Sequence, residues 1–138
     1  MSQNTAPIFT QTPNIGIGLI AAANTTSQYD MITGASSSLF TAGPSGSYVS
    51  KIRVKPSGST VATVLRFFIN NGSTTSIATN NTLYAEISLP AITLSATLAQ
   101  NDFEVPLNIA LPGSYTIYGL ANTWSTGGFK ITTIGGDY

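Results

Sequence analysis

A strict alternation of apolar and polar residues in the C-terminal third restricts the fold of this chain more than any other feature. In the stretch 103–109, FEVPLNI, every odd position is apolar and every even position is charged, proline or an amide. A Pro112-Gly113 turn, a second alternating run over 115–122, a Gly127-Gly128 turn and a β-rich run at 129–134 follow. A period of two interrupted by proline and glycine is typical of antiparallel strands that bury one face.

The same pattern recurs upstream and predicts an all-β domain. The stretch 91–100 fits a strand or an extended loop better than a helical turn. We therefore expect a single-domain antiparallel β-sandwich of eight or nine short strands, Greek-key or jelly-roll-like. Residues 1–14, which are polar and contain two prolines, are expected to form an extended N-terminal arm before a sandwich domain over 15–138. The upstream strands are expected at 15–21, 39–41, 48–55, 61–69 and 83–89.

The composition favours a subunit of an assembly. Only 7% of the residues are charged and the formal net charge is zero, whereas about 25% is usual. Surfaces with few charges and no net charge promote association, although a β-sandwich could have this composition by itself. The chain contains neither histidine nor cysteine, which removes the usual general base, the commonest metal ligand and all thiolate chemistry.

The carboxylates do not form a recognisable catalytic or metal-binding pattern. A glycosidase needs two carboxylates across a cleft, and Glu86 and Glu104 could approach each other if their strands were adjacent. Both occupy outward positions, however, where pairing with lysine or arginine is favoured. No G-x-S-x-G motif and no calcium loop occur. We therefore expect no enzyme activity and no cofactor.

Other binding classes are also disfavoured by the sequence. The G-x-G-x-x-A match at 16–21 lacks a preceding strand and a suitably placed acidic residue, so it does not indicate a dinucleotide site. The zero net charge argues against a nucleic-acid partner. The apolar run 15–23 is too short to span a bilayer, and no signal-peptide pattern precedes it. We expect synthesis in the cytoplasm and no membrane partner.

The stretch 48–55 places Lys51, Arg53 and Lys55, the basic ladder, on one face of a strand together with Val49. Arg66 in the next strand is expected to lie near this ladder. The ladder is either a solvated face neutralised by Glu86 or Glu104, or a contact strip for an acidic partner surface. The opposite face is expected to carry Tyr48, Ser50, Ile52 and Val54.

Three further side chains are candidates for partner contacts. Ile8 and Phe9 are the bulky apolar residues of the arm, which either frays or docks on a neighbouring subunit or sheet edge. Trp124 lies in an expected loop, where it either plugs the end of the sandwich or anchors a protein or a glycan.

Residues 48–138 contain a series of short motifs: Thr82-Leu83-Tyr84 with Glu86, Leu89-Pro90, Pro106-Leu107-Asn108, Leu111-Pro112-Gly113, Gly-Gly-Phe at 127–129 and Ile134-Gly135-Gly136-Asp137-Tyr138. Through these motifs the chain resembles small structural proteins encoded by tailed phages, which have a similar length and a Gly-Gly-Asp-aromatic C-terminus. By analogy with other small phage β-domains, the resemblance implies a capsid decoration (cement) protein on the virion surface. Such a protein would bind the major capsid protein as a homotrimer or homodimer and stabilise the capsid without catalysis. The alternative is a tail- or fibre-associated receptor- or glycan-binding module.

Overall fold

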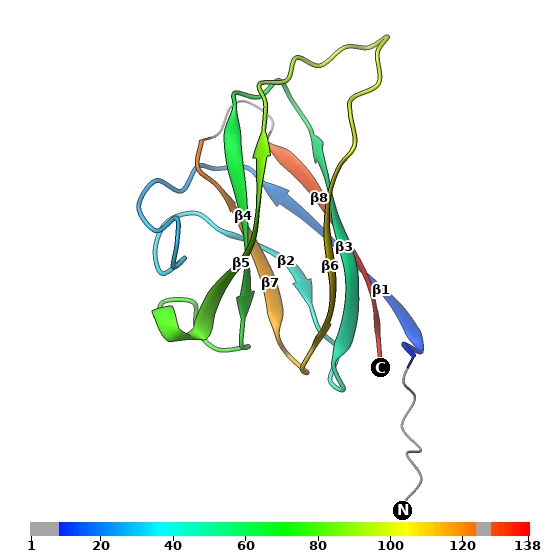
Figure 1. Cartoon of the computed structure of the whole chain (residues 1–138). Helices are drawn as coiled ribbons and strands as arrows, with labels where there is room; N and C mark the ends of the chain where they lie inside the picture. Colours follow the sequence, from blue (N-terminus) through cyan, green and yellow to red (C-terminus); the bar gives the residue numbers. More distant parts are fainter. Residues whose placement is uncertain (1–8, 124–127) are drawn as a thin grey trace, which may run out of the picture.

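Two antiparallel four-stranded sheets face each other in the computed structural model, which describes residues 9–123 and 128–138 (Figure 1). One sheet has the strand order β1-β8-β3-β6, and the other has the order β2-β7-β4-β5. A single 3-10 turn, η1 (Ala78–Asn80), is the helical element of the described residues. The strands are β1 (Thr12–Ile20), β2 (Ser37–Thr41), β3 (Ser47–Pro56), β4 (Thr63–Asn70), β5 (Asn81–Leu89), β6 (Phe103–Leu111), β7 (Thr116–Ala121) and β8 (Phe129–Asp137).

The strands pair in a nested order that defines a jelly roll. β1 pairs with β8, β2 with β7, β3 with β6 and β4 with β5, as if one long antiparallel hairpin were rolled into two sheets. The expected all-β sandwich is confirmed. β1 begins at Thr12, so the sheet includes residues that the sequence assigned to the arm. The stretch 91–100 is an extended loop that is tied to the sandwich by an isolated bridge between Thr60 and Ile92.

The main core lies between the sheets and is built from the inward positions of both. Burial of each such side chain contributes about 1.5–3 kcal/mol relative to exposure. Its fully buried members, exposed by 2% or less, include Ile20, Leu39, Val49, Ile52, Val54, Leu65, Phe67, Ile117, Phe129 and Ile131.

Two β-bulges correct the faces expected from simple alternation. The register shifts between Val49 and Lys51, so Val49 is fully buried and Tyr48 is exposed, the reverse of the sequence prediction. A second shift, between Phe67 and Phe68, places Leu83 against Phe68 on the outer face of the sheet. The sequence pattern had predicted that Leu83 would face the main core. A bulge adds one residue to one strand, so alternation on its two sides is out of phase.

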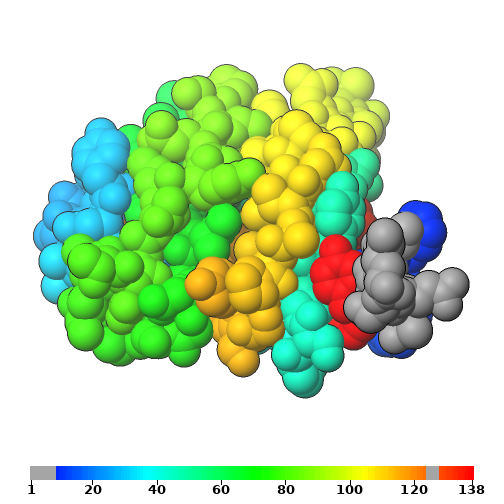
Figure 2. Space-filling view, turned by 60° about the horizontal axis from the view of Figure 1, so that its bottom comes forward, coloured from blue at the N-terminus to red at the C-terminus, as the bar shows by residue number. Residues whose placement is uncertain are grey.

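A second apolar cluster covers the outer face of the β2-β7-β4-β5 sheet. Met31, from the loop that joins β1 to β2 over residues 21–36, packs there with Phe68 and Leu120. The buried Asn24 side chain organises this β1–β2 loop, because its Nδ2 donates to the carbonyls of Thr33 (2.9 Å) and Ala35 (3.1 Å). Figure 2 shows the light-blue loop lying beside the green β5 region. Part of one outer sheet face, over β4 and β7, is therefore covered by the chain itself.

Candidate interaction surface

The basic ladder lies on the outer face of the β1-β8-β3-β6 sheet, and its three members share that face as the sequence predicted. Lys51 Nζ is 3.2 Å from Glu104 Oε1, and Arg53 Nε is 3.1 Å from the same oxygen. Arg53 Nη2 lies 3.0 Å from Asp102 Oδ1, which Lys55 also contacts. Neutralisation by Glu104 is thus confirmed, and Asp102 joins it from just before β6. Because these side chains are exposed to solvent, the ion pairs add little to stability.

The hydrogen-bonded ammonium of Lys55, with the nearby guanidinium of Arg53, lowers the pKa of the Asp102 carboxyl below its ordinary value. Asp102 is therefore ionised at neutral pH and leaves the ladder partly neutralised. The sequence did not single out Asp102, because it precedes the alternating stretch that became β6.

An exposed apolar row lies on edge strand β1 of the same face. Ile15, Ile17 and Leu19, the apolar row, are 58%, 82% and 42% exposed. The intervening glycines face inward, where a Cβ atom on Gly16 would clash with the backbone carbonyl oxygen of Leu39 in β2. The Gly-apolar alternation in the sequence is the signal that could have revealed this row, because a strand that packs closely through glycines presents its large side chains outward.

Strand pairing places the apolar row beside the basic ladder. In one row across the sheet, Leu19 pairs with Lys130 of β8, which pairs with Lys55 of β3. In the next row, Ile17 pairs with Thr132, which pairs with Arg53. Neighbouring strands lie about 4.8 Å apart, so the surface changes from apolar to cationic over about 10 Å. We call this surface, formed by the apolar row, Lys130 and the basic ladder, the apolar–basic face.

Arg66 does not lie near the ladder, contrary to the sequence prediction. It belongs to β4 in the other sheet and is buried beneath the β1–β2 loop. Its Nε is 2.7 Å from Glu86 Oε1, and its guanidinium carbon lies 4.7 Å from the centre of the Tyr29 ring. These contacts fix the loop to the sheet, so Arg66 is a structural residue here. Glu86 and Glu104 also lie in different sheets, so the adjacency considered for a glycosidase pair is wrong.

The candidates in the arm and the final loop are only partly described. Phe9 is 77% exposed and, with Thr10, Tyr48 and Tyr138, lines a hollow of about 320 Å³. Ile8 and Trp124 lie outside the described residues, so the contacts predicted for them remain predictions.

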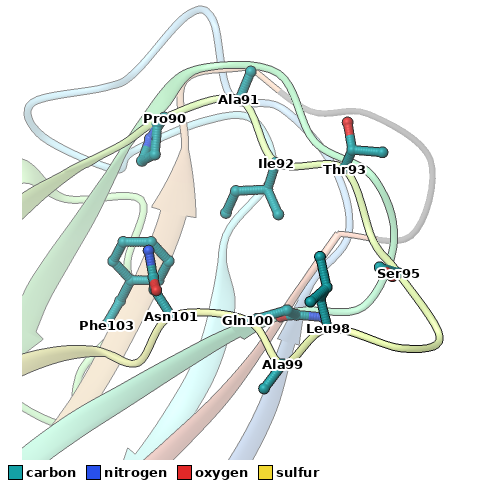
Figure 3. Close-up of a pocket in the computed structure, with 10 residues that line it drawn as sticks. All are labelled: Pro90, Ala91, Ile92, Thr93, Ser95, Leu98, Ala99, Gln100, Asn101 and Phe103. Atoms are coloured by element: carbon teal, nitrogen blue, oxygen red, sulfur yellow. The ribbon is translucent and has the colours of Figure 1, made fainter.

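A separate pocket of about 290 Å³ lies within the β5–β6 loop (Figure 3). Ile92, Leu98 and Phe103 point into the space between the two arms of this loop. None of its lining residues has a titratable side chain, so the pocket can hold an apolar group but supplies no acid or base. Among residues 9–123 and 128–138, no group of three or more acidic side chains forms a metal site. No helix in the same part of the chain is long and apolar enough to cross a membrane.

Replacing Asp137 with asparagine should remove a pH-dependent part of the stability. Hydrogen bonds from Ser47 Oγ, Asn14 Nδ2 and the Gly43 amide lower the pKa of the Asp137 carboxyl below its ordinary value. A lowered folded-state pKa stabilises the fold above the unfolded-state pKa, and this contribution disappears as the pH falls through the folded-state value. We expect the variant to be less stable by about 1 kcal/mol at pH 7. Urea unfolding at several pH values should show the difference shrinking below about pH 4; a constant difference would contradict this explanation.

Comparison of the chain with protein-family models, curated proteins and solved structures gives no match.

Proposed function

We propose that this protein is a structural protein of a tailed-phage virion, and specifically a capsid decoration protein that binds the major capsid protein without catalysis. The observation that carries the proposal is the exposed apolar–basic face. The β1–β2 loop covers the β4 and β7 part of the outer face of the opposite sheet, whereas the apolar row has exposed fractions of 42–82%. The resemblance over residues 48–138 and the low charge content support the same function.

The two halves of the apolar–basic face would make different contributions to binding. The apolar row supplies area that is removed from water, at about 25 cal/mol per Å². The cations set orientation and exclude unsuitable partners more than they add affinity. A stable interface buries about 800 Å² on each partner, and binding to the assembled lattice stabilises it by mass action. In a homotrimer or homodimer, linked faces would bind neighbouring capsid subunits with increased avidity.

Replacing Ile17 with serine should weaken binding to capsids about tenfold without changing the fold. Ile17 is 82% exposed in the free protein, and burying its side chain in an interface would contribute about 1.5–3 kcal/mol. The measurement is cosedimentation of purified protein with expanded capsids that lack it. Ile77→Ser is the matched control, because Ile77 is 51% exposed and lies just before η1, beside the other sheet.

Two results would contradict the proposal at different levels. Equal weakening by Ile17→Ser and Ile77→Ser would show that the apolar–basic face is not the contact surface. Mass spectrometry of purified virions that fails to find this protein would exclude the virion function itself.

A further inference from the structure

A hollow on the apolar–basic face is surrounded by cations from two strands. It has a volume of about 230 Å³ and is lined by Arg53 and Lys55 of β3 and by Lys130, Thr132 and Ile134 of β8. Lys130 and Lys55 are direct cross-strand partners, and like charges in that arrangement repel each other. Asp102 pairs with Lys55 and Arg53, whereas Lys130 makes no ion pair with a described side chain. An external anion in this hollow would relieve the repulsion.

The charges of the whole chain show that the face has a cationic excess. All ten charged side chains belong to described residues. The apolar–basic face and its β6 edge carry four cations against two carboxylates, Asp102 and Glu104, which leaves an excess of two positive charges. The cations are Lys51, Arg53, Lys55 and Lys130.

The remaining carboxylates do not form an acidic surface that a second copy could offer to this face. Glu86 pairs with Arg66, and Asp137 accepts hydrogen bonds from Ser47 and Asn14. Asp30 accepts from the backbone amide of Ile32 within the β1–β2 loop. Complementary charge must therefore come from a different molecule.

We infer that the hollow around Lys130 binds a carboxylate of a partner polypeptide whose neighbouring aliphatic side chains rest on the apolar row. Leu19 is the cross-strand partner of Lys130, and Ile17 lies two residues from Leu19 on the same face of β1. One short segment of a partner can therefore contact both Lys130 and the apolar row. Same-side residues of an extended segment are about 7 Å apart. This spacing allows a carboxylate over Lys130 with an aliphatic side chain two residues away over β1. The inference rests on the proposed function, because it specifies what the partner surface carries.

The test uses the full chain and a dye-labelled, capped peptide in which one glutamate has leucine two residues away on either side, with serine elsewhere. A second peptide carries glutamine in place of glutamate. By fluorescence anisotropy, the unmodified protein should bind the glutamate peptide about fivefold more tightly, the upper range for a partly exposed ion pair. Lys130→Gln should abolish this preference. Ile77→Ser changes an exposed side chain outside the apolar–basic face and should retain it.

The stability of the Lys130 variant provides an independent check. Lys130 is exposed, and its replacement removes the repulsion with Lys55, so Lys130→Gln should unfold at the same or a higher urea concentration than the unmodified protein. A clear loss of stability would assign Lys130 a structural role and overturn the inference.

Several binding results would also overturn it. One is an equal preference for the glutamate peptide in Lys130→Gln and in the unmodified protein, and another is no saturable peptide binding below about 1 mM. The others are tighter binding of a single-stranded oligonucleotide than of the glutamate peptide, and self-association of the protein that requires Lys130. The capsid assay separates this inference from the proposed function. If Lys130→Gln binds capsids as well as unmodified protein does, the carboxylate site fails while the proposed function stands. If the unmodified protein binds the glutamate peptide but does not bind capsids, the proposed function fails while the carboxylate site stands.

Discussion

Replacing Phe68 with alanine is expected to lower the free energy of unfolding by about 3–5 kcal/mol, as for a core phenylalanine. Phe68 points away from the main core, and alternation alone would assign it to the surface. Its side chain is nevertheless fully buried, because Met31 and Leu120 pack around it beneath the β1–β2 loop. The truncation would leave a cavity under a loop that has few other apolar anchors. Chemical denaturation followed by circular dichroism measures the effect.

Ile77→Ala is the control for Phe68→Ala, since Ile77 is 51% exposed and should cost less than about 1 kcal/mol. Phe68→Ala should also increase proteolysis within the β1–β2 loop more than elsewhere. Its capsid binding should remain unchanged at temperatures where the variant is folded, because the apolar–basic face belongs to the other sheet. A cost for Phe68→Ala as small as that of the control would show that the loop does not cover the sheet in solution.

Replacing Gly16 with valine is expected to destabilise the protein by about 3 kcal/mol and to weaken capsid binding as well. A Cβ atom at this position would overlap the backbone carbonyl oxygen of Leu39. Backbone cannot move aside as a flexible side chain can, so the cost lies at the upper end of the range for overpacking. Relief of the clash would displace β1 from β2 and shift the apolar row relative to the ladder. Urea unfolding and capsid cosedimentation measure the two effects.

The neighbouring position provides the control for Gly16→Val. Ile17→Val changes an outward side chain and should leave the free energy of unfolding within about 0.5 kcal/mol of the original value. If Gly16→Val were equally mild, β1 would not pack on β2 through its glycines, and the orientation proposed for the apolar row would lose its structural basis.

Local patterns predicted the strands well because alternation reports which face of a strand is buried. They could not predict the bulge after Val49, since an extra residue in one strand shows only against its partner strand. Arg66 illustrates a second limit. Its outward direction followed from the sequence, but its burial depends on Tyr29 in a distant loop.

The candidate surface was predicted only in part for the same reason. The basic ladder lies within one strand and was visible as a local pattern. Its neighbours, Leu19 and Lys130, come from opposite ends of the chain and are brought together by strand pairing. A row across a sheet is a property of topology, and short sequence patterns do not encode which strands become neighbours.

The nested pairing also has a consequence for when the binding surface can form. β1 leaves the ribosome before the other described strands, and its partner β8 is the last of them in chain order. Sheets dominated by such distant pairings fold slowly, in milliseconds to seconds. Until β8 has been synthesised, β1 lacks the strand with which it pairs, and Lys130 is absent from its side. The complete apolar–basic face therefore forms only after β8 has been synthesised, so chains that lack β8 do not present it.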